Sequence, residues 1–299
     1  MSFTGLSAFP LTPLTADVID DHAFAALVRR LASAKVDSIT ALGSTGCYPY
    51  FSRAERAHVA RLAVEHAGST PVFVGVGALR TSHVLAHAQD AEQAGAAGLL
   101  LAPMTYQALT DDEVHHLFRA LTESTTLPVI VYDNPGTTHF SFSAQLYARI
   151  AALPGIASIK IPALPADPDH ARARVAEIRS VIPEHVSIGI SGDASAAAGL
   201  AAGCDAWYSV IGGTLPQPAL TITRAALGGD VDAAHAESAR LTPMWDLFRA
   251  CGGSLRVIAA VAEILGLARR SSLPAPLLGL DDDERARLAV VLQELELAP

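Results

Sequence analysis

Eight short apolar runs, spaced by roughly 20 to 35 residues, are the feature that most constrains the fold of this chain. Segments of helical character separate them, and several open on capping residues, as Ser52 with Glu55 and Thr110 with Glu113 do. Neighbouring strands in such an alternation are parallel, because each return crossing is a helix. Eight units of this kind close into a (β/α)8 TIM barrel. The expected strands are Gly5–Phe9, Ser38–Ala41, Val72–Gly75, Gly98–Leu101, Val129–Tyr132, Ile156–Lys160, Ser187–Ser191 and Ala206–Ser209.

An open, doubly wound sheet is the alternative fold, but no GxGxxG fingerprint follows the first run. Beyond Leu227 the strand pattern ends, and three further helices are predicted over Val231–Ala250, Ser254–Leu267 and Asp281–Leu297. We therefore expect a catalytic barrel over residues 1–228 and a helical C-terminal extension over residues 229–299 that packs against it.

The net charge and the number of cysteines limit the kinds of molecule that this chain is expected to bind. The 299 residues carry a net charge of −9 without a block rich in Lys or Arg, which argues against binding to nucleic acid or to an anionic membrane. No apolar stretch reaches the roughly 18 residues of a membrane helix, and the N-terminus does not resemble a signal peptide. Three scattered cysteines and isolated histidine pairs predict neither a disulfide framework nor a metal site. We expect a cytoplasmic protein that acts on a small molecule.

The chain has only two lysines, and one of them stands where chemistry is expected. Active sites of such barrels lie at the C-terminal ends of the strands, and Lys160 ends the run that begins at Ile156. Burial among aliphatic neighbours lowers the pKa of an amine, which suits a nucleophile that forms a Schiff base. A solvated lysine, or one paired with a carboxylate such as Asp193, is the alternative.

Other polar residues close neighbouring runs. Tyr132 ends the preceding strand and could move a proton beside Lys160, or simply lie at the barrel rim. Gly43-Ser44-Thr45-Gly46 offers hydroxyl and N–H groups suited to a carboxylate; a phosphate cradle, for which the P-loop lysine is missing, and a plain turn are the alternatives.

Four motifs in order resemble the dihydrodipicolinate synthase/N-acetylneuraminate lyase family. They are Gly43-Ser44-Thr45-Gly46, the Tyr132-x-x-Pro135-Gly136 turn, the lysine 28 residues after that tyrosine, and Ser191-Gly192-Asp193. The resemblance covers nearly the whole chain. It implies a barrel with a helical tail, a dimer or tetramer, and a lysine imine with pyruvate or another 2-oxo acid, formed without a metal or an organic cofactor.

The resemblance also implies roles for single residues. Lys160 corresponds to the imine lysine, Tyr132 to the proton relay, and Ser44 and Thr45 to the carboxylate-binding pair, with Gly46, Cys47 and Gly192 as further substrate-binding residues. Tyr106 lies one residue away from the position at which the family borrows a tyrosine from a neighbouring subunit.

Two departures from the family pattern bear on the activity. Cys47 stands where the family has a glutamate after the Gly-Ser-Thr-Gly turn. Its side chain is either a reactive thiol or a small residue that fills space. Thr137 stands in the segment where the synthase type carries an arginine for the carboxylate of its second substrate. We therefore predict a lyase that forms a Schiff base with a 2-oxo acid and is not a true dihydrodipicolinate synthase. A sugar-acid dehydratase of the same family and a non-catalytic barrel that binds 2-oxo acids are the alternatives.

Overall fold

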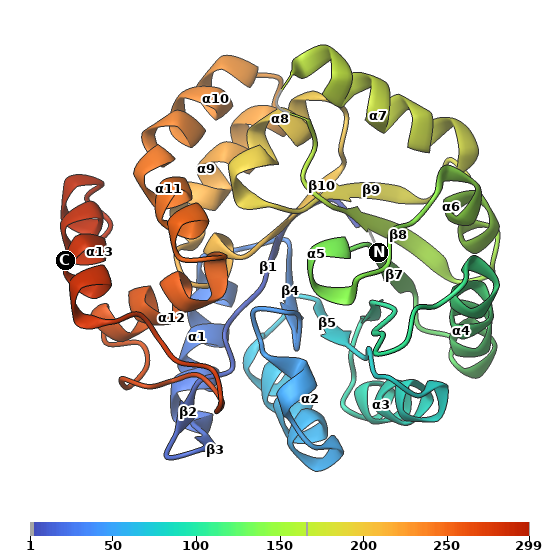
Figure 1. The fold of residues 1–299 in the computed structure, drawn as a ribbon, viewed down its shortest axis with the longest axis horizontal. Coiled ribbons are helices and arrows are strands. Elements are labelled where there is room, and N and C mark those ends of the chain that lie inside the picture. The colour runs from blue at the N-terminus through green and yellow to red at the C-terminus, as the bar shows by residue number, and fades with distance from the viewer. Residues whose placement is uncertain (1–2, 166, 299) are drawn as a thin grey trace.

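Eight parallel strands close into a barrel in the order β1-β10-β9-β8-β7-β6-β5-β4 (Figure 1). The computed structural model describes residues 3–165 and 167–298. The two predicted domain ranges also include residues 1, 2, 166 and 299, which lie outside the described residues. The barrel confirms the predicted fold, and the strand bounds differ from the predicted ones by at most one residue. The strands are β1 (Gly5–Ala8), β4 (Ser38–Ala41), β5 (Val72–Gly75), β6 (Gly98–Leu101), β7 (Val129–Tyr132), β8 (Ile156–Ile161), β9 (Ser187–Ile190) and β10 (Ala206–Ser209).

A ring of helices surrounds the strands (Figure 1). Both predicted capping boxes are present, at Ser52 and at Thr110. The ring consists of α1 (Asp21–Ser33), α2 (Arg53–His66), α3 (Thr81–Gln93), α4 (Asp111–Ser124), α6 (Ala144–Ala151), α7 (Pro168–Val181), α8 (Ala196–Ala201) and α9 (Pro216–Leu227).

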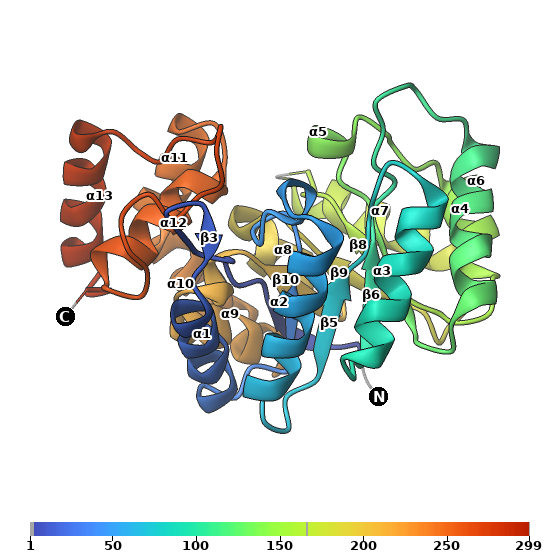
Figure 2. The ribbon, with the colours of Figure 1, turned by 90° about the horizontal axis from the view of Figure 1, so that it is seen from below.

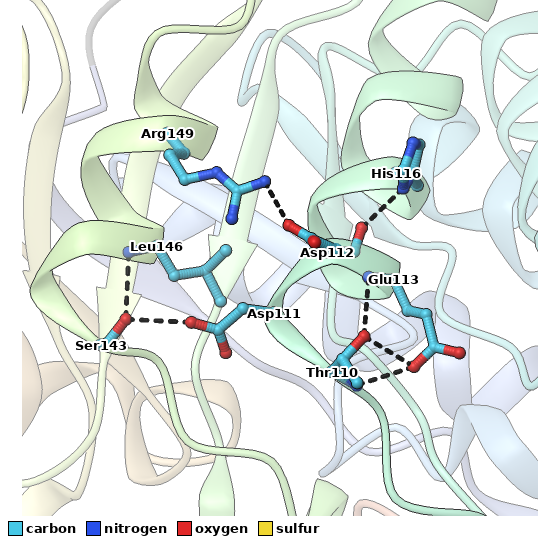
Figure 3. A network of polar contacts seen from close by, with 8 residues as sticks. All are labelled: Thr110, Asp111, Asp112, Glu113, His116, Ser143, Leu146 and Arg149. Atoms are coloured by element: carbon cyan, nitrogen blue, oxygen red, sulfur yellow. Dashed lines mark hydrogen bonds and ion pairs between the residues drawn. The ribbon is translucent and has the colours of Figure 1, made fainter.

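Polar contacts at the ends of α4 and α6 join these two neighbours in the ring (Figure 3). Arg149 on α6 pairs with Asp112 in the first turn of α4 at 2.7 Å, and the Ser143 hydroxyl donates to Asp111 at 3.2 Å. Ser143 also accepts from the N–H of Leu146 and so caps α6. These contacts hold together the two helices that flank the loop leading from β7.

The strands alternate between two apolar cores. Ile130 and Tyr132 belong to the cluster inside the barrel, whereas Val129 and Val131 pack outward in the core beneath the helices. The period-2 alternation of a strand explains this division. On β8 the same alternation directs Ser158 and Lys160 inward, and the Tyr208 phenol donates to Ser158 at 2.7 Å across the interior.

Several short elements lie outside the predicted pattern. Strands β2 (Leu14–Thr15) and β3 (Val18–Ile19) form an antiparallel hairpin whose two turn residues, Ala16 and Asp17, both have positive φ. The single-turn helix α5 (Pro135–Thr138) follows β7 and lies over the centre of the ring in Figure 1. Short 3-10 turns occupy Tyr48–Tyr50, Asp193–Ser195 and Ile211–Gly213.

The C-terminal part is helical, as predicted, and α11, α12 and α13 gather at one side of the barrel (Figure 2). The helix predicted over Val231–Ala250 is in fact two helices that meet at Leu241. Pro243 explains the break, because proline lacks the N–H of a helix interior and is tolerated in a first turn. The four helices are α10 (Val231–Arg240), α11 (Thr242–Ala250), α12 (Ser254–Ile264) and α13 (Asp282–Glu294).

The division between residues 228 and 229 stays a prediction. Among the helices that the structure describes, none combines the length and the apolar character needed to cross a membrane.

Candidate active site

Lys160 lies inside the mouth of the barrel, at the end of β8, and is 2% exposed. Its Nζ is 4.2 Å from the ring centroid of Tyr132 and 4.6 Å from that of Phe9. No residue that the structure describes accepts a hydrogen bond from this amine or forms an ion pair with it. Burial lowers the pKa of Lys160 to about 7, against a smaller opposing effect of Asp193. The amine is therefore available in its neutral form near physiological pH.

Asp193, the carboxylate considered as a partner of Lys160, forms no ion pair or hydrogen bond with that lysine in the described part of the chain. Its carboxylate accepts hydrogen bonds from the N–H of Ile211 at 2.7 Å, the N–H of Val210 at 3.1 Å and the indole of Trp207 at 3.1 Å. Burial raises the pKa of Asp193 despite these donors. The carboxylate thus acts on Lys160 from a distance and leaves the amine free to react.

Tyr132 is the register partner of Lys160 on the neighbouring strand β7. Its phenol oxygen is 3.3 Å from the hydroxyl of Ser44, so the structure brings together the three residues predicted from separate motifs. Burial raises the pKa of Tyr132 to about 12, with a smaller lowering effect from Ser44. The phenol therefore keeps its proton at neutral pH and can act as an acid.

Asn134 contacts the same phenol and was missed in the sequence analysis. Its amide donates to Tyr132 at 2.9 Å and to Thr137 at 3.0 Å, and lies 3.4 Å from the oxygen of Ser44. A compositional signal was available, because Asn134 is the single asparagine of the chain.

The loop after β4 carries the predicted carboxylate-binding residues. Thr45, Gly46 and Cys47 are buried, whereas Ser44 is partly exposed. The Cys47 thiol, whose pKa burial raises to about 12, lies 3.8 Å from the carbonyl of Thr45. A protonated, enclosed thiol fits the filler alternative better than a reactive cysteine.

The residue after Cys47 adds a second buried phenol that the sequence analysis did not single out. Cys47 has a φ of +54°, and the chain turns there into the buried side chain of Tyr48. Arg56 lies over the Tyr48 ring, 5.2 Å from its centroid, and donates to the carbonyl oxygens of Gly75 and Gly77 at 2.8 and 3.0 Å. Burial raises the pKa of the Tyr48 phenol, and the nearby Tyr132 adds to the rise. Arg56 thereby fixes this part of the rim.

The two remaining predicted site residues are Gly192 and Tyr106. Gly192 turns the chain after β9 with a φ of +84°, and a Cβ there would lie 3.0 Å from the Cβ of Ala163, just beyond the end of β8. Tyr106 is 88% exposed, so within one chain it is not brought to Lys160.

Asp133 is buried behind the site and was not predicted. It accepts a hydrogen bond from the Tyr147 phenol at 2.5 Å, while its Oδ1 has no partner among the described residues. Burial raises the pKa of Asp133 to about 6, against the lowering effect of Tyr147. The residue that follows Tyr132 is thus a buried carboxyl group with a single side-chain hydrogen bond.

Comparison with known proteins identifies the family to which the chain belongs. The model of the dihydrodipicolinate synthetase family matches residues 2–295. The chain belongs to this family. Family membership confirms the resemblance and makes the protein a lyase.

Relatives within the family are named for different activities. A 4-hydroxy-tetrahydrodipicolinate synthase of Sorangium cellulosum is 29% identical over 99% of this chain and 95% of its own. YagE of Escherichia coli K12, whose name proposes a 2-dehydro-3-deoxy-D-gluconate aldolase, is 27% identical over 99% of this chain and 98% of its own.

Solved structures of the family superpose closely. A dihydrodipicolinate synthase of Agrobacterium tumefaciens C58 is 45% identical, with a TM-score of 0.94 over 98% of both chains. The structure of YagE in complex with pyruvate has a TM-score of 0.91 at 27% identity over 99% of both chains.

Proposed function

We propose that the protein forms an imine between Lys160 and pyruvate or a related 2-oxo acid, and then makes or breaks the adjacent carbon–carbon bond. The observation that carries the proposal is the amine of Lys160, which is buried, has a pKa of about 7 and lies 4.2 Å from the ring of Tyr132. The YagE structure, which contains pyruvate, supports a 2-oxo acid as the substrate.

The reaction begins with attack of the neutral amine on the ketone carbon, which gives a carbinolamine. Tyr132 donates its proton to the carbinolamine oxygen, water leaves, and the imine forms. The imine then accepts the electron pair of the breaking carbon–carbon bond, so that an enamine replaces a carbanion. Ser44 and Thr45 hold the carboxylate, with Gly46, Cys47 and Gly192 enclosing that end of the substrate.

The second substrate is an aldehyde that needs no guanidinium to bind it. Helix α5 reads Pro-Gly-Thr-Thr, and its side chain next to Asn134 is the uncharged, exposed Thr137. A bidentate grip on the carboxylate of aspartate semialdehyde is therefore missing from this segment. The proposed activity is that of an aldolase for neutral, hydroxylated aldehydes, and the name of YagE supports this substrate class.

Oligomerisation and location belong to the same proposal. Tyr106 is 88% exposed on the isolated chain, as expected of a residue that enters the site of a neighbouring subunit in a homodimer or homotetramer. The proposed location is the cytoplasm, where the cysteines, all three free, stay reduced.

A substrate panel tests the function. Purified protein is incubated with 2-keto-3-deoxy sugar acids, and pyruvate release is followed with lactate dehydrogenase. We expect turnover by the wild type and by the control variant Lys35→Arg, which changes the exposed second lysine of the chain. We expect no turnover by Lys160→Ala. Dehydration of the substrate without release of pyruvate would identify a dehydratase instead. Activity retained by Lys160→Ala, or no turnover of any 2-oxo acid, would contradict the proposal.

A further inference from the structure

We propose that Asn134 is a positioning residue that directs proton transfer at Tyr132. Its amide N–H donates to the phenol oxygen, so that the phenol's own proton points toward Ser44 or the substrate. This inference rests on the proposed role of Tyr132 as the proton donor.

The hydrogen-bonding capacity of the amide supports this direction. The Nδ2 atom carries two protons, and its two short contacts are Tyr132 at 2.9 Å and Thr137 at 3.0 Å. Ser44 lies farther away, at 3.4 Å, and is 3.3 Å from the phenol oxygen. With both amide protons engaged, the proton of Tyr132 has Ser44 as its acceptor within the protein.

The backbone holds the amide in this place. Asn134 precedes Pro135, and its carbonyl oxygen accepts from the N–H of Thr137 at 3.0 Å, the N–H of Thr138 at 2.9 Å and the hydroxyl of Thr138 at 3.0 Å. Thr138 is buried and in turn accepts at its own carbonyl from Thr105 at 3.0 Å. The short helix α5 therefore fixes Asn134 over the phenol before substrate binds.

A neutral donor suits the chemistry of the site. When Tyr132 gives its proton to the carbinolamine oxygen, the phenol O–H bond breaks, an O–H bond forms on the leaving water, and a buried phenolate remains until Ser44 passes a proton back from solvent. An N–H donor stabilises that phenolate. A carboxylate in the same place would repel it and would also favour the protonated form of Lys160, whereas an amide does neither.

The variant Asn134→Asp tests whether Asn134 must donate a hydrogen bond to Tyr132. An ionised carboxylate has the same shape as the amide but can only accept hydrogen bonds. Asn134→Ala removes the group without adding charge. Gln145→Glu makes the same amide-to-acid change on an exposed residue of α6 and serves as the control. Imine formation with pyruvate is followed by borohydride trapping across pH 5.5 to 9, and thermal melting reports folding.

We expect both Asn134 variants to form the Lys160 adduct about 10- to 100-fold more slowly, with little change in the pyruvate concentration at half saturation. The pH profile should keep its acid limb in Asn134→Ala and move to higher pH in Asn134→Asp. Gln145→Glu should match the wild type.

Wild-type rates in Asn134→Asp would overturn the inference while leaving the proposed function intact, as would a loss of rate that only follows a loss of folded protein. Absence of any adduct in the wild type would instead refute the proposed function.

Discussion

Replacement of Lys160 by methionine should stabilise the protein, by an amount that depends on pH. The buried amine has a pKa of about 7 against an ordinary 10.5, so between these values the unfolded chain binds a proton that the folded chain does not. Stability of the wild type therefore rises with pH across this window. Linkage puts the cost of the buried amine at about 4 kcal/mol at pH 7, about 2 kcal/mol at pH 9 and under about 1 kcal/mol at pH 10. Methionine has a similar unbranched shape and lacks the charge.

Urea unfolding of the wild type and Lys160→Met at pH 7, 9 and 10 measures this difference. The variant should be more stable at pH 7, and the gap should close as the pH rises. Lys35→Met, which changes an exposed lysine, serves as the control and should show no such trend. A destabilised Lys160→Met variant at pH 7, or a gap that does not change with pH, would refute the assignment of a neutral, buried amine.

Three further predictions concern the surroundings of the site. Because burial raises the pKa of Asp133 to about 6 from 3.8, wild-type stability should fall as the pH rises through that window. In urea unfolding, Asp133→Asn should gain about 2 to 3 kcal/mol above pH 6 and almost nothing at about pH 3. Tyr106→Ala should lose activity without changing the oligomer seen in sedimentation, and a fully active monomer would exclude a cross-subunit role. Aspartate semialdehyde should condense poorly with pyruvate, because Thr137 offers no guanidinium; efficient turnover in a reductase-coupled assay would contradict this.

Periodicity in the sequence was sufficient to predict the barrel. Each strand is a short apolar run whose alternate residues face two different cores, and turn residues bound each run, so local pattern and tertiary structure agree. The same argument placed Lys160 and Tyr132 at adjacent strand ends, where the structure has them in register. The break at Leu241 was signalled by Pro243 and was overlooked.

Features that depend on tertiary contacts were not predictable in this way. The fold of α5 over the barrel mouth brings Asn134 to the phenol of Tyr132, and no local pattern encodes that meeting. Likewise, Arg56 reads as a surface residue of a helix, yet it is buried and donates to the carbonyl oxygens of Gly75, at the end of β5, and of Gly77. Asp193 was considered as an ion-pair partner of Lys160, whereas the donors to its carboxylate are Trp207, Val210 and Ile211, which lie 14 or more residues away in sequence.

The central claim is that the amine of Lys160 is the nucleophile, and peptide mass spectrometry after borohydride reduction in the presence of pyruvate tests it most directly. Only two lysines exist in the chain, so the adduct has two possible side-chain positions. We predict a single adduct on Lys160 that is lost in Lys160→Ala and kept in Lys35→Arg. An adduct on Lys35 alone, or none on Lys160 with pyruvate or any other 2-oxo acid, would contradict the account.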